Sequence, residues 1–563
     1  MSSKRRTFRL SFAAAAVLLV ALAVLLTGVL GRMGGARIDL TQDKIYTMSP
    51  AAKKILSELK VPVQVKLYIT GSDKMPTELK TLERDITDKL EDYRRASGGM
   101  LEYAVYDPQD NEEMQNDLTS RGIRPFQVQS IDKDEIGVKL VWSAITIAYK
   151  DYPEEVIPQV LPQSLSTLEY DLISRIYRLT REKNPKVALV APKQEVDPQV
   201  AMMYLQQGMQ PPQPQDVYTQ AVQLLQQEHY DVQRVDLTAD SRIPDDADVL
   251  VVLNPTRFNE RQAFEINRAL SNGLNTVIAV QQHTYDYQPG YRGGFTVSGI
   301  ENPTGLDSLL AAFGVPVSHD HLFDTSIQVL SIPRTQSIGG LRFQTNEPVR
   351  LPMQILVTSE QMNHESPLTN RIGSLLYLWG TALQPDQTKL DALKLERTVL
   401  FTSSPNTWTV EFAPSVVPGS DFNPNGKEMV GPQPLAMLLE GQFPDTWQGK
   451  ETPAWPDSDQ VGEVAPLELQ PAKLILVGCA KMFDDMALQA GQNALLLLNC
   501  VDALAHGEDL ISIRSKALTQ RTIRPVGESQ KLLFRLFTVV LVPVLLAIYG
   551  LVRAGRRRKE AAQ

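Results

Sequence analysis

Two long apolar runs stand near the ends of the chain, at residues 12–30 and 536–552. Neither run contains a charged residue, and each approaches the roughly 20 residues with which a helix crosses a bilayer. Basic residues flank both runs on the side of the chain ends: Lys4, Arg5, Arg6 and Arg9 before the first, and Arg553, Arg556, Arg557, Arg558 and Lys559 after the second. Because Lys and Arg beside a span stay in the cytoplasm, the pattern predicts transmembrane helices at 12–31 and 532–552.

The two predicted spans determine where the rest of the chain lies. Both ends, residues 1–11 and 553–563, should be cytoplasmic, and the body between the spans should be extracytoplasmic. A cleaved signal peptide is the alternative for the first run. Its apolar region would have about 7–15 residues and end at a small-residue cleavage site. The longer run and the poor site in GVLGRMGGA favour an uncleaved anchor.

The first part of the body, residues 37–162, alternates strand and helix patterns. Ser49 and Pro50 suit the N-cap and the first turn of a helix. Helices are expected near 50–60, 77–96 and 111–122, and strands at 61–70, 100–107, 126–131, 139–150 and 154–160. This order favours a small α/β domain of thioredoxin-like layout, although the chain has no C-x-x-C.

The second part, residues 163–515, begins with an amphipathic helix at 164–182. Largely apolar strands at 185–192, 230–237, 246–255 and 275–281 alternate with helices at 217–229 and 259–273. Strands of this kind are typical of a buried parallel sheet, so a larger doubly wound α/β domain is expected. The Gln/Pro-rich stretch near 200–215 reads as a loop inserted into it.

Beyond residue 282 the pattern is less regular. We expect an aromatic and glycine-rich loop at 284–295, a helix at 304–314, and an irregular or β-rich segment at 315–351. A helix is expected at 374–380, between strands at 353–360 and 397–404. Residues 404–471 are rich in Pro, Gly, Asn and Asp and predict a long insertion. A buried strand at 472–480 and a helix at 492–507 return to the second domain, and 516–531 links it to the second span.

Charge is distributed unevenly along the chain. Residues 33–530 hold 44 Lys and Arg against 64 Asp and Glu, a net charge of −20. Nucleic acids select basic surfaces, so this balance argues against a nucleic-acid partner. The two cysteines, Cys479 and Cys500, fall in apolar runs, which favours two buried small residues over a disulfide.

Three groups of side chains are candidates for chemistry. His319, Asp320, His321 and Asp324 could approach a metal, since alternate strand positions would put both histidines on one face, but a polar strand end explains them better. Asp484 and Asp485 follow a strand, where α/β sheets bind ligands, although an N-cap role is the simpler interpretation. Tyr285, Tyr287, Tyr291 and Phe295 could stack on a sugar or peptide, and a packed loop is the alternative.

Four phrases of the sequence resemble the GldG-like proteins, which are auxiliary components of ABC transporters associated with gliding motility. Asp39-Leu40-Thr41 and Tyr46-Thr47-Met48-Ser49 follow the first span, as in that family. Further phrases lie at 399–409 (VLFTSSPNTWT), 473–504 and 507–516 (GEDLISIRSK). The resemblance therefore touches nearly the whole chain, through phrases without a catalytic signature.

The resemblance implies partners rather than a reaction. Such proteins are expected to work with an ABC permease and a cytoplasmic ATPase in the bacterial inner membrane. Their central domain is similar to the α/β domain of an intraflagellar transport protein, which is related to class I glutamine amidotransferase-like folds. Those enzymes need a nucleophile, yet Gln281, Gln282 and His283 follow the strand at 275–281 here, without a cysteine.

Two hypotheses about function follow. The first is a non-enzymatic, membrane-anchored auxiliary subunit without a cofactor, whose body binds a substrate, a cell-envelope component or another protein. The chain has no G-x-x-x-x-G-K-[ST], so ATP binding of the P-loop kind is not expected in it. The alternative is a cell-envelope hydrolase or ligand-modifying enzyme that uses the aspartates and histidines above.

Overall fold

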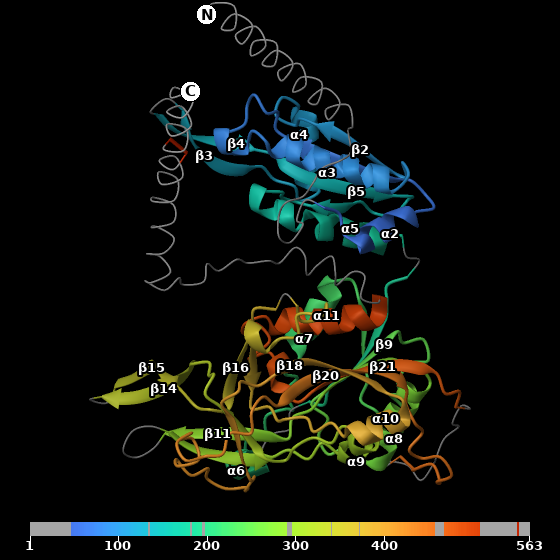
Figure 1. The fold of residues 1–563 in the computed structure, drawn as a ribbon. Helices are drawn as coiled ribbons and strands as arrows, with labels where there is room; N and C mark the ends of the chain where they lie inside the picture. Colours follow the sequence, from blue (N-terminus) through green and yellow to red (C-terminus); the bar gives the residue numbers. More distant parts are fainter. Residues whose placement is uncertain are drawn as a thin grey trace, which may run out of the picture. The chain divides into compact units, whose positions relative to one another are not determined.

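A computed structural model describes residues 47–132, 135–180, 183–193, 198–289, 295–338, 341–370, 372–455, 467–506 and 549–550 (Figure 1). The predicted spans 12–31 and 532–552 lie outside these residues, apart from Tyr549 and Gly550. No helix within the described part of the chain is both long enough and apolar enough to cross a bilayer.

The small domain begins with helix α2, Pro50–Ser57. The Ser49 side chain accepts a hydrogen bond from Ala52 N at 3.1 Å, and Pro50 occupies the first turn, so the predicted cap is confirmed. The buried carboxylate of Glu169 accepts a hydrogen bond from Ser49 N at 2.8 Å. The start of the domain is therefore tied to a later helix of the same core.

The small domain has a four-stranded sheet in the order β2-β1-β5-β6. These strands are β1 Val63–Ile69, β2 Leu101–Tyr106, β5 Ser143–Tyr149 and β6 Glu155–Ile157. β1 is parallel to β2 and antiparallel to β5. Three helices pack on one face of this sheet: α2, α3 (Leu82–Ala96) and α5 (Leu168–Leu179). A fourth helix, α4 (Glu112–Ser120), contributes Leu118 to a separate cluster that includes Tyr68 and Trp142. The sheet strands and the helices between them follow along the chain as β1, α3, β2, α4, β5 and β6, close to the predicted ranges.

Three details of the small domain differ from expectation. The helix expected at 77–96 begins as a separate 3-10 turn, Thr77–Leu79. The strand expected at 139–150 is divided at Trp142, because its first half forms a hairpin of β3 (Phe126–Asp132) with β4 (Glu135–Val141). Finally, α5 buries Leu172, Ile173 and Ile176 in the small domain's core, so this core extends past the expected boundary at 162.

The large domain contains a seven-stranded mixed sheet (Figure 1). Its strands, in spatial order, are β18 Glu396–Thr402, β20 Pro434–Gln442, β21 Pro471–Val477, β10 Asn275–Ala279, β9 Val249–Leu253, β7 Lys186–Val190 and β8 Asp231–Arg234. The five strands from β21 to β8 are parallel, and β20 is antiparallel to both of its neighbours. The expected parallel sheet is thus extended by two further strands.

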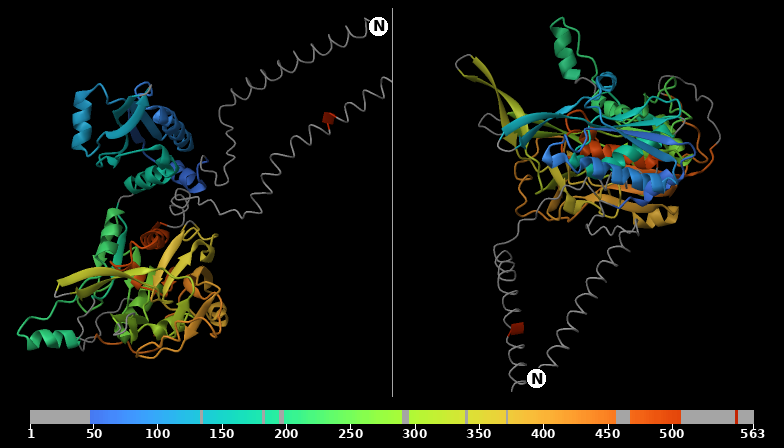
Figure 2. Two further views of the ribbon diagram at one scale, coloured as in Figure 1. Left: turned by 90° about the vertical axis from the view of Figure 1, so that its left-hand side faces the viewer. Right: turned by 90° about the horizontal axis from the view of Figure 1, so that it is seen from above.

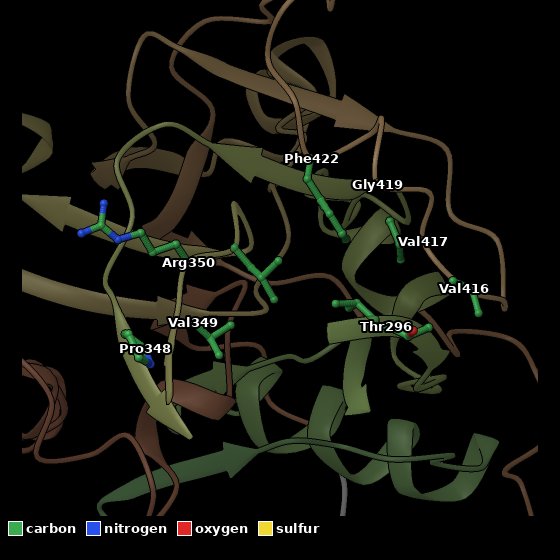
Figure 3. Close-up of a pocket in the computed structure, with 10 residues that line it drawn as sticks. Thr296, Pro348, Val349, Arg350, Val416, Val417, Gly419 and Phe422 are labelled. Carbon is green, nitrogen blue, oxygen red and sulfur yellow. The ribbon is translucent and has the colours of Figure 1, made fainter. Parts of the chain in front are cut away.

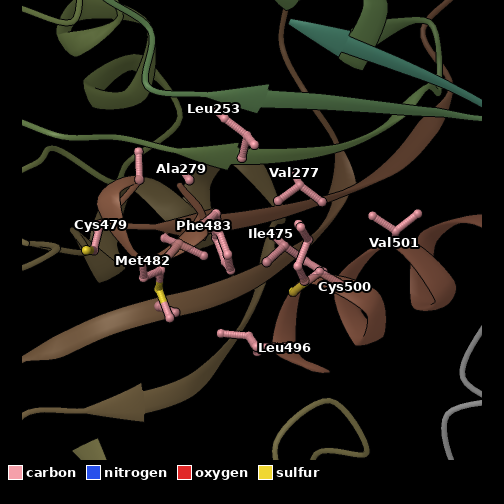
Figure 4. Packing of buried hydrophobic residues seen from close by; sticks show 14 of the residues in the cluster. Leu253, Val277, Ala279, Ile475, Cys479, Met482, Phe483, Leu496, Cys500 and Val501 are labelled. Carbon is pink, nitrogen blue, oxygen red and sulfur yellow. The ribbon is translucent and has the colours of Figure 1, made fainter. Parts of the chain in front are cut away.

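Helices cover both faces of this sheet, as expected for a doubly wound domain. Alternate strand residues point to opposite faces, as Val251 and Val252 on β9 illustrate. The first face packs against α7 (Thr219–Gln227) and α11 (Asn493–His506), and the second against α8 (Glu260–Ser271), α9 (Asp307–Ala312) and α10 (Gln387–Leu393). Cys479 and Cys500 are buried free thiols in the first core (Figure 4).

A set of two-stranded ribbons, here called the ribbon region, occupies residues 283–378 and 407–422 of the large domain. The pairs are β11 His283–Pro289 with β12 Phe295–Glu301, β13 His321–Asp324 with β19 Thr407–Val410, β14 Leu330–Ile338 with β15 Leu341–Val349, and β16 Gln354–Thr358 with β17 Ser374–Leu378. Tyr285, Val297, Phe323, Met353 and Trp408 form its main apolar cluster.

Four expectations for the large domain are wrong. Residues 284–289 and 295 belong to the paired strands β11 and β12 rather than to a loop, residues 290–294 lie outside the described residues, and 374–378 form a strand rather than a helix. The expected insertion 404–471 contributes β19 and also β20, the second strand from one edge of the large sheet. Part of the expected loop near 200–215 is helix α6, Pro198–Gln206, which stands clear of the sheet in both views of Figure 2.

Candidate functional site

The carboxyl ends of β9, β10 and β21 bring polar residues to one edge of the large sheet, here called the carboxyl edge. Asn254 follows β9, Gln281 and Gln282 follow β10, and Lys481 follows β21. Parallel strands end together at this edge, which is where α/β folds usually bind their ligands. The carboxyl edge is therefore the first place to look for a site.

Gln281 is the centre of the carboxyl edge. Its side chain is 1% exposed, its Oε1 accepts a hydrogen bond from Lys481 N at 3.0 Å, and its Nε2 donates to His283 O at 2.7 Å and to Trp379 O at 2.6 Å. The amide thus satisfies three backbone groups from three separate segments. Its role is to join these segments, and its polar atoms are already used.

The neighbouring polar side chains also bond to one another. Asn302 Nδ2 donates to Asn254 Oδ1 at 3.0 Å and to Gln281 O at 2.6 Å. Asp307 accepts from Gln282 Nε2 at 2.6 Å and from Thr304 Oγ1 at 2.9 Å. These bonds fix the loops beyond β9 and β10 with respect to each other.

Trp379 connects the carboxyl edge to the ribbon region. Its backbone lies in the left-handed region, with φ +62°, which costs a bulky side chain about 1–3 kcal/mol. Its Nε1 donates to Tyr287 Oη at 2.5 Å, and Lys481 Nζ lies 5.2 Å from its ring centroid. Lys481 also pairs with Asp484 at 2.7 Å. Contacts on both sides hold this strained residue in place.

Asp484 and Asp485, the carboxylates singled out in the sequence, both have structural partners. Asp484 is 3% exposed, and its Oδ1 accepts from Met486 N and Ala487 N at 3.0 Å each. Asp485 accepts from Gln220 N at 2.8 Å and from Thr219 Oγ1 at 2.5 Å, so it caps the start of α7 rather than a helix of its own segment. Capping, which was the simpler interpretation, is therefore what the geometry supports.

The tyrosines predicted as a stacking surface are packed in the ribbon region. Tyr285 Oη lies 2.6 Å from His321 Nδ1, and burial raises the pKa of Tyr285 far above its ordinary value. Burial raises the pKa of Tyr287 to about 12. Tyr291 lies outside the described residues. Tyr285 and Tyr287 therefore contribute to a core, as the packed-loop alternative predicted.

His283 is the unusual side chain of the ribbon region. It is 2% exposed, and its ring stacks on Phe412 with centroids 4.2 Å apart. Neither ring nitrogen makes a hydrogen bond within the described part of the chain. Burial, and next the nearby His321, lower the pKa of His283 to about 4, although the His319 backbone acts in the opposite direction. His283 is thus a neutral, buried imidazole.

The segment at 319–324 does not form the metal site that was considered. His319 lies before β13, mostly exposed and 3.6 Å from an Asp307 oxygen, whereas His321 is buried on β13, so the two histidines are not on one strand face. No group of three or more His, Cys, Asp or Glu among residues with a described placement is arranged to hold a metal ion.

Asp324 has a role that was not predicted. Its buried carboxylate accepts hydrogen bonds from Ser404 N at 2.8 Å, Ser404 Oγ at 2.5 Å, Thr407 Oγ1 at 3.0 Å and Ser326 N at 2.8 Å. Ser404 and Thr407 belong to the phrase VLFTSSPNTWT, which contributed to the family resemblance. Residues of that phrase therefore surround the buried Asp324 carboxylate. Asp324 and Ser404 are 80 residues apart in the sequence, and no local sequence pattern indicates that they interact.

A groove of about 460 Å³ opens on the ribbon region (Figure 3). It is lined by Thr296, Val297, Pro348, Val349, Arg350, Leu351, Val416, Val417, Gly419 and Phe422. Most of these residues have apolar side chains, and the Arg350 side chain is exposed. Its size falls in the range of small-ligand sites, roughly 300–1,000 Å³. The groove can therefore accept an apolar group beside an anionic one, and sequence reasoning missed it because it is formed by three distant segments.

The comparisons with known proteins follow the same division of the chain. Residues 42–148 match a domain of unknown function, and residues 184–500 match the family described as "ABC-type uncharacterized transport system". An uncharacterized protein of Borreliella burgdorferi is 21% identical over 538 residues, which cover 93% of this chain and 94% of that protein.

Two solved structures are also similar to parts of the chain. The IFT52 N-terminal domain is 12% identical, with a TM-score of 0.30, and covers 57% of this chain and 98% of its own. A ThuA-like protein from Bacteroides uniformis is 12% identical, with a TM-score of 0.27, and covers 57% and 93%. Because the transport-system model spans more than half of its length, the chain belongs to this family and is an auxiliary component of an ABC-type transport system.

Proposed function

We propose that the chain is a non-enzymatic auxiliary subunit that is anchored in the bacterial inner membrane by two helices. Its body lies outside the cytoplasm and works with an ABC permease and a cytoplasmic ATPase. Family membership supports the association with a transporter. The apolar runs at 12–30 and 536–552 and their basic flanks support the topology. The phrases at 39–49 and 399–409 support the finer assignment to the GldG-like group.

The bonding of the carboxyl edge carries the non-enzymatic part of the proposal. A nucleophile or general base must reach a substrate atom. Here Gln281 and Asp484 are buried and bonded to their neighbours. Burial also raises the pKa of Cys479 and of Cys500 to about 12, which keeps both thiols protonated and unreactive. The buried, hydrogen-bonded side chains and the protonated thiols favour a structural role for these residues over a catalytic one.

The groove beside Arg350 is the part of the body best suited to bind a substrate or partner. It is open to solvent, most of its lining residues have apolar side chains, and Arg350 is the charged residue among the described residues that line it. Binding there does not require the carboxyl edge to open. In this hypothesis, ATP-driven movement of the permease passes through the two spans to the body and changes what the groove can hold.

Co-purification in mild detergent tests the proposal. The full-length chain, tagged and co-expressed with the permease and ATPase of its own transport system, should retain both proteins. Isolation of the chain alone under these conditions would contradict the proposal.

A matched variant distinguishes the proposal from the hydrolase alternative. Combining His319→Gln with Asp485→Asn removes the most accessible candidate groups while the Asn side chain still caps α7. An auxiliary subunit should keep its complex and its transport activity with this pair of substitutions. Loss of activity with the complex intact would favour the enzyme.

A further inference from the structure

Helix α6 carries a concentration of exposed apolar side chains. Met202, Met203 and Leu205 are 58%, 49% and 60% exposed, and Met209 just beyond the helix is 47% exposed. Most other large apolar side chains with high exposure occur singly among the described residues. Single exposed apolar residues need no explanation, whereas a group within one turn and a half of helix indicates an interaction site.

The surroundings of α6 are also free of charge. Residues 198–215 contain no Asp, Glu, Lys or Arg, although the body as a whole has a net charge of −20. The polar residues of this stretch are mostly glutamines. Ordinary surface helices carry charged residues on their outer face. The composition of α6 is therefore typical of a surface that contacts a partner in the assembled transport complex.

A lipid surface does not match this composition. Helices that lie in the membrane interface typically have Lys and Arg on their polar face, because these residues bind anionic lipids. α6 has neither, and the acidic body would be repelled by anionic headgroups.

A second copy of the chain does not match the size of α6. At about 1.5 Å per residue, a nine-residue helix is about 14 Å long. Two such helices side by side would bury on the order of 500 Å², well below the roughly 1,200 Å² of a stable interface. A groove encloses a helix on several sides and so buries more of each exposed side chain.

We infer that α6 docks into an uncharged, apolar groove on the permease of the transport system, with Met202, Met203 and Leu205 as its anchors. The inference rests on the proposed function, which supplies the permease as partner. Helix-in-groove recognition uses apolar anchors at spacings such as i and i+3, which is the spacing of Met202 and Leu205. Methionine side chains are flexible and polarisable, so they fit a groove that changes shape during a transport cycle. The glutamines remain available for hydrogen bonds at its rim.

A triple substitution tests the docking. Met202→Gln, Met203→Gln and Leu205→Gln together keep good helix formers in α6 but remove its apolar side chains. In the full-length chain co-expressed with its permease and ATPase, we expect at least an approximately tenfold loss of co-purified permease. Met486→Gln is the matched control, because Met486 is 70% exposed and lies outside α6. It should leave the permease yield unchanged.

A photo-crosslinking residue at position 203 identifies what covers α6. An adduct with the permease, absent when the same residue is placed at 486, supports the inference. An adduct with a second copy, binding of neutral phosphatidylcholine vesicles that the triple variant abolishes, or full permease retention by that variant would each overturn it while leaving the proposed function intact. Absence of the permease from the wild-type complex would overturn the proposed function itself.

Discussion

Gln281 and His283 lie two residues apart after β10 and are almost completely buried, yet the hydrogen bonding of their side-chain polar atoms is opposite. Gln281, at the carboxyl edge, makes hydrogen bonds to three backbone groups. His283, in the ribbon region, has two ring nitrogens without a partner in the described structure and is held by stacking on Phe412. The first residue fixes geometry, whereas the second lowers stability in a way that depends on pH.

The same contrast separates the two regions as a whole. At the carboxyl edge, Gln281, Asn302 and Asp307 each make more than one hydrogen bond, so substitution of any of them should break several bonds at once. The described residues of the ribbon region include the strongly bonded carboxylate of Asp324, a histidine without a hydrogen-bond partner among them, and an open groove. Substitutions of matched residues in the two regions can therefore show which region makes the domain rigid and which region can change with function.

The largest effect is expected for Asp324→Ala. Removing the carboxylate leaves Ser404 N and Ser326 N without their acceptor in a buried site. We expect the free energy of unfolding of the large domain to fall by about 3–5 kcal/mol, measured by urea denaturation. The control Asp320→Ala should change it by less than about 0.5 kcal/mol. Equal losses would show that Asp324 is not a special support of the ribbon region.

The next effect concerns pH. His283 has a pKa of about 4 in the folded chain and about 6.5 when unfolded, so between these values only the unfolded chain binds the proton. Stability is therefore full above about pH 6.5 and falls as the pH decreases toward 4, by on the order of 3 kcal/mol. Urea midpoints at pH 5 and pH 8 measure the difference.

His283→Phe is the matched variant for this prediction. The phenyl ring keeps the stacking on Phe412 and has no nitrogen to protonate, so most of the pH dependence should disappear. Part of it should remain, because burial also lowers the pKa of His321, on which Asp320 and Asp421 act in the opposite direction. An unchanged pH profile would mean that His283 does not titrate as a buried group.

A smaller effect compares two neighbouring glutamines. Gln281→Leu should cost about 2 kcal/mol or more, because three backbone groups lose their partner. Gln282→Leu should cost about 1 kcal/mol or less, since that side chain has one hydrogen bond to Asp307 and an Oε1 without a partner. Thermal unfolding of both variants under the same conditions provides the ranking. The reverse order would contradict the bonding described for the carboxyl edge.

The smallest effect on stability is expected for Arg350→Gln. The side chain is exposed, so the free energy of unfolding should change by less than about 0.5 kcal/mol. If the groove is the binding site of the body, transport in cells should nevertheless fall while the permease still co-purifies. Normal transport by this variant would place binding elsewhere.

Much of the fold follows from local patterns in the sequence. The alternation at 61–70, the cap at Ser49 and the apolar strands of the parallel sheet are visible without a structure. Residues 374–378 were assigned to a helix because a short apolar run fits a buried strand equally well. Strand β20 was missed because Pro and Gly around it made the whole stretch resemble an insertion.

The candidate site was less predictable than the fold. The strand before Asp484 and Asp485 marks both residues in the sequence, but the role of Asp485 depends on α7, more than two hundred residues earlier. The groove and the Asp324 network depend on tertiary contacts between distant segments, for which one sequence contains no local signal. By contrast, the uncharged stretch 198–215 is plain in the sequence and was interpreted only as a flexible loop.

The order of strands in the large sheet has a consequence for how the body is made. β10 pairs with β21, and the bond between Gln281 and Lys481 spans 200 residues of chain. During synthesis or translocation, β18 emerges before β20 and β21. A chain at this stage therefore lacks the two strands that separate β18 from β10 in the sheet. Pairing over such distances is slow. Until the C-terminal part of the body has emerged, β10 and β18 keep open edges, which are templates for pairing with other chains.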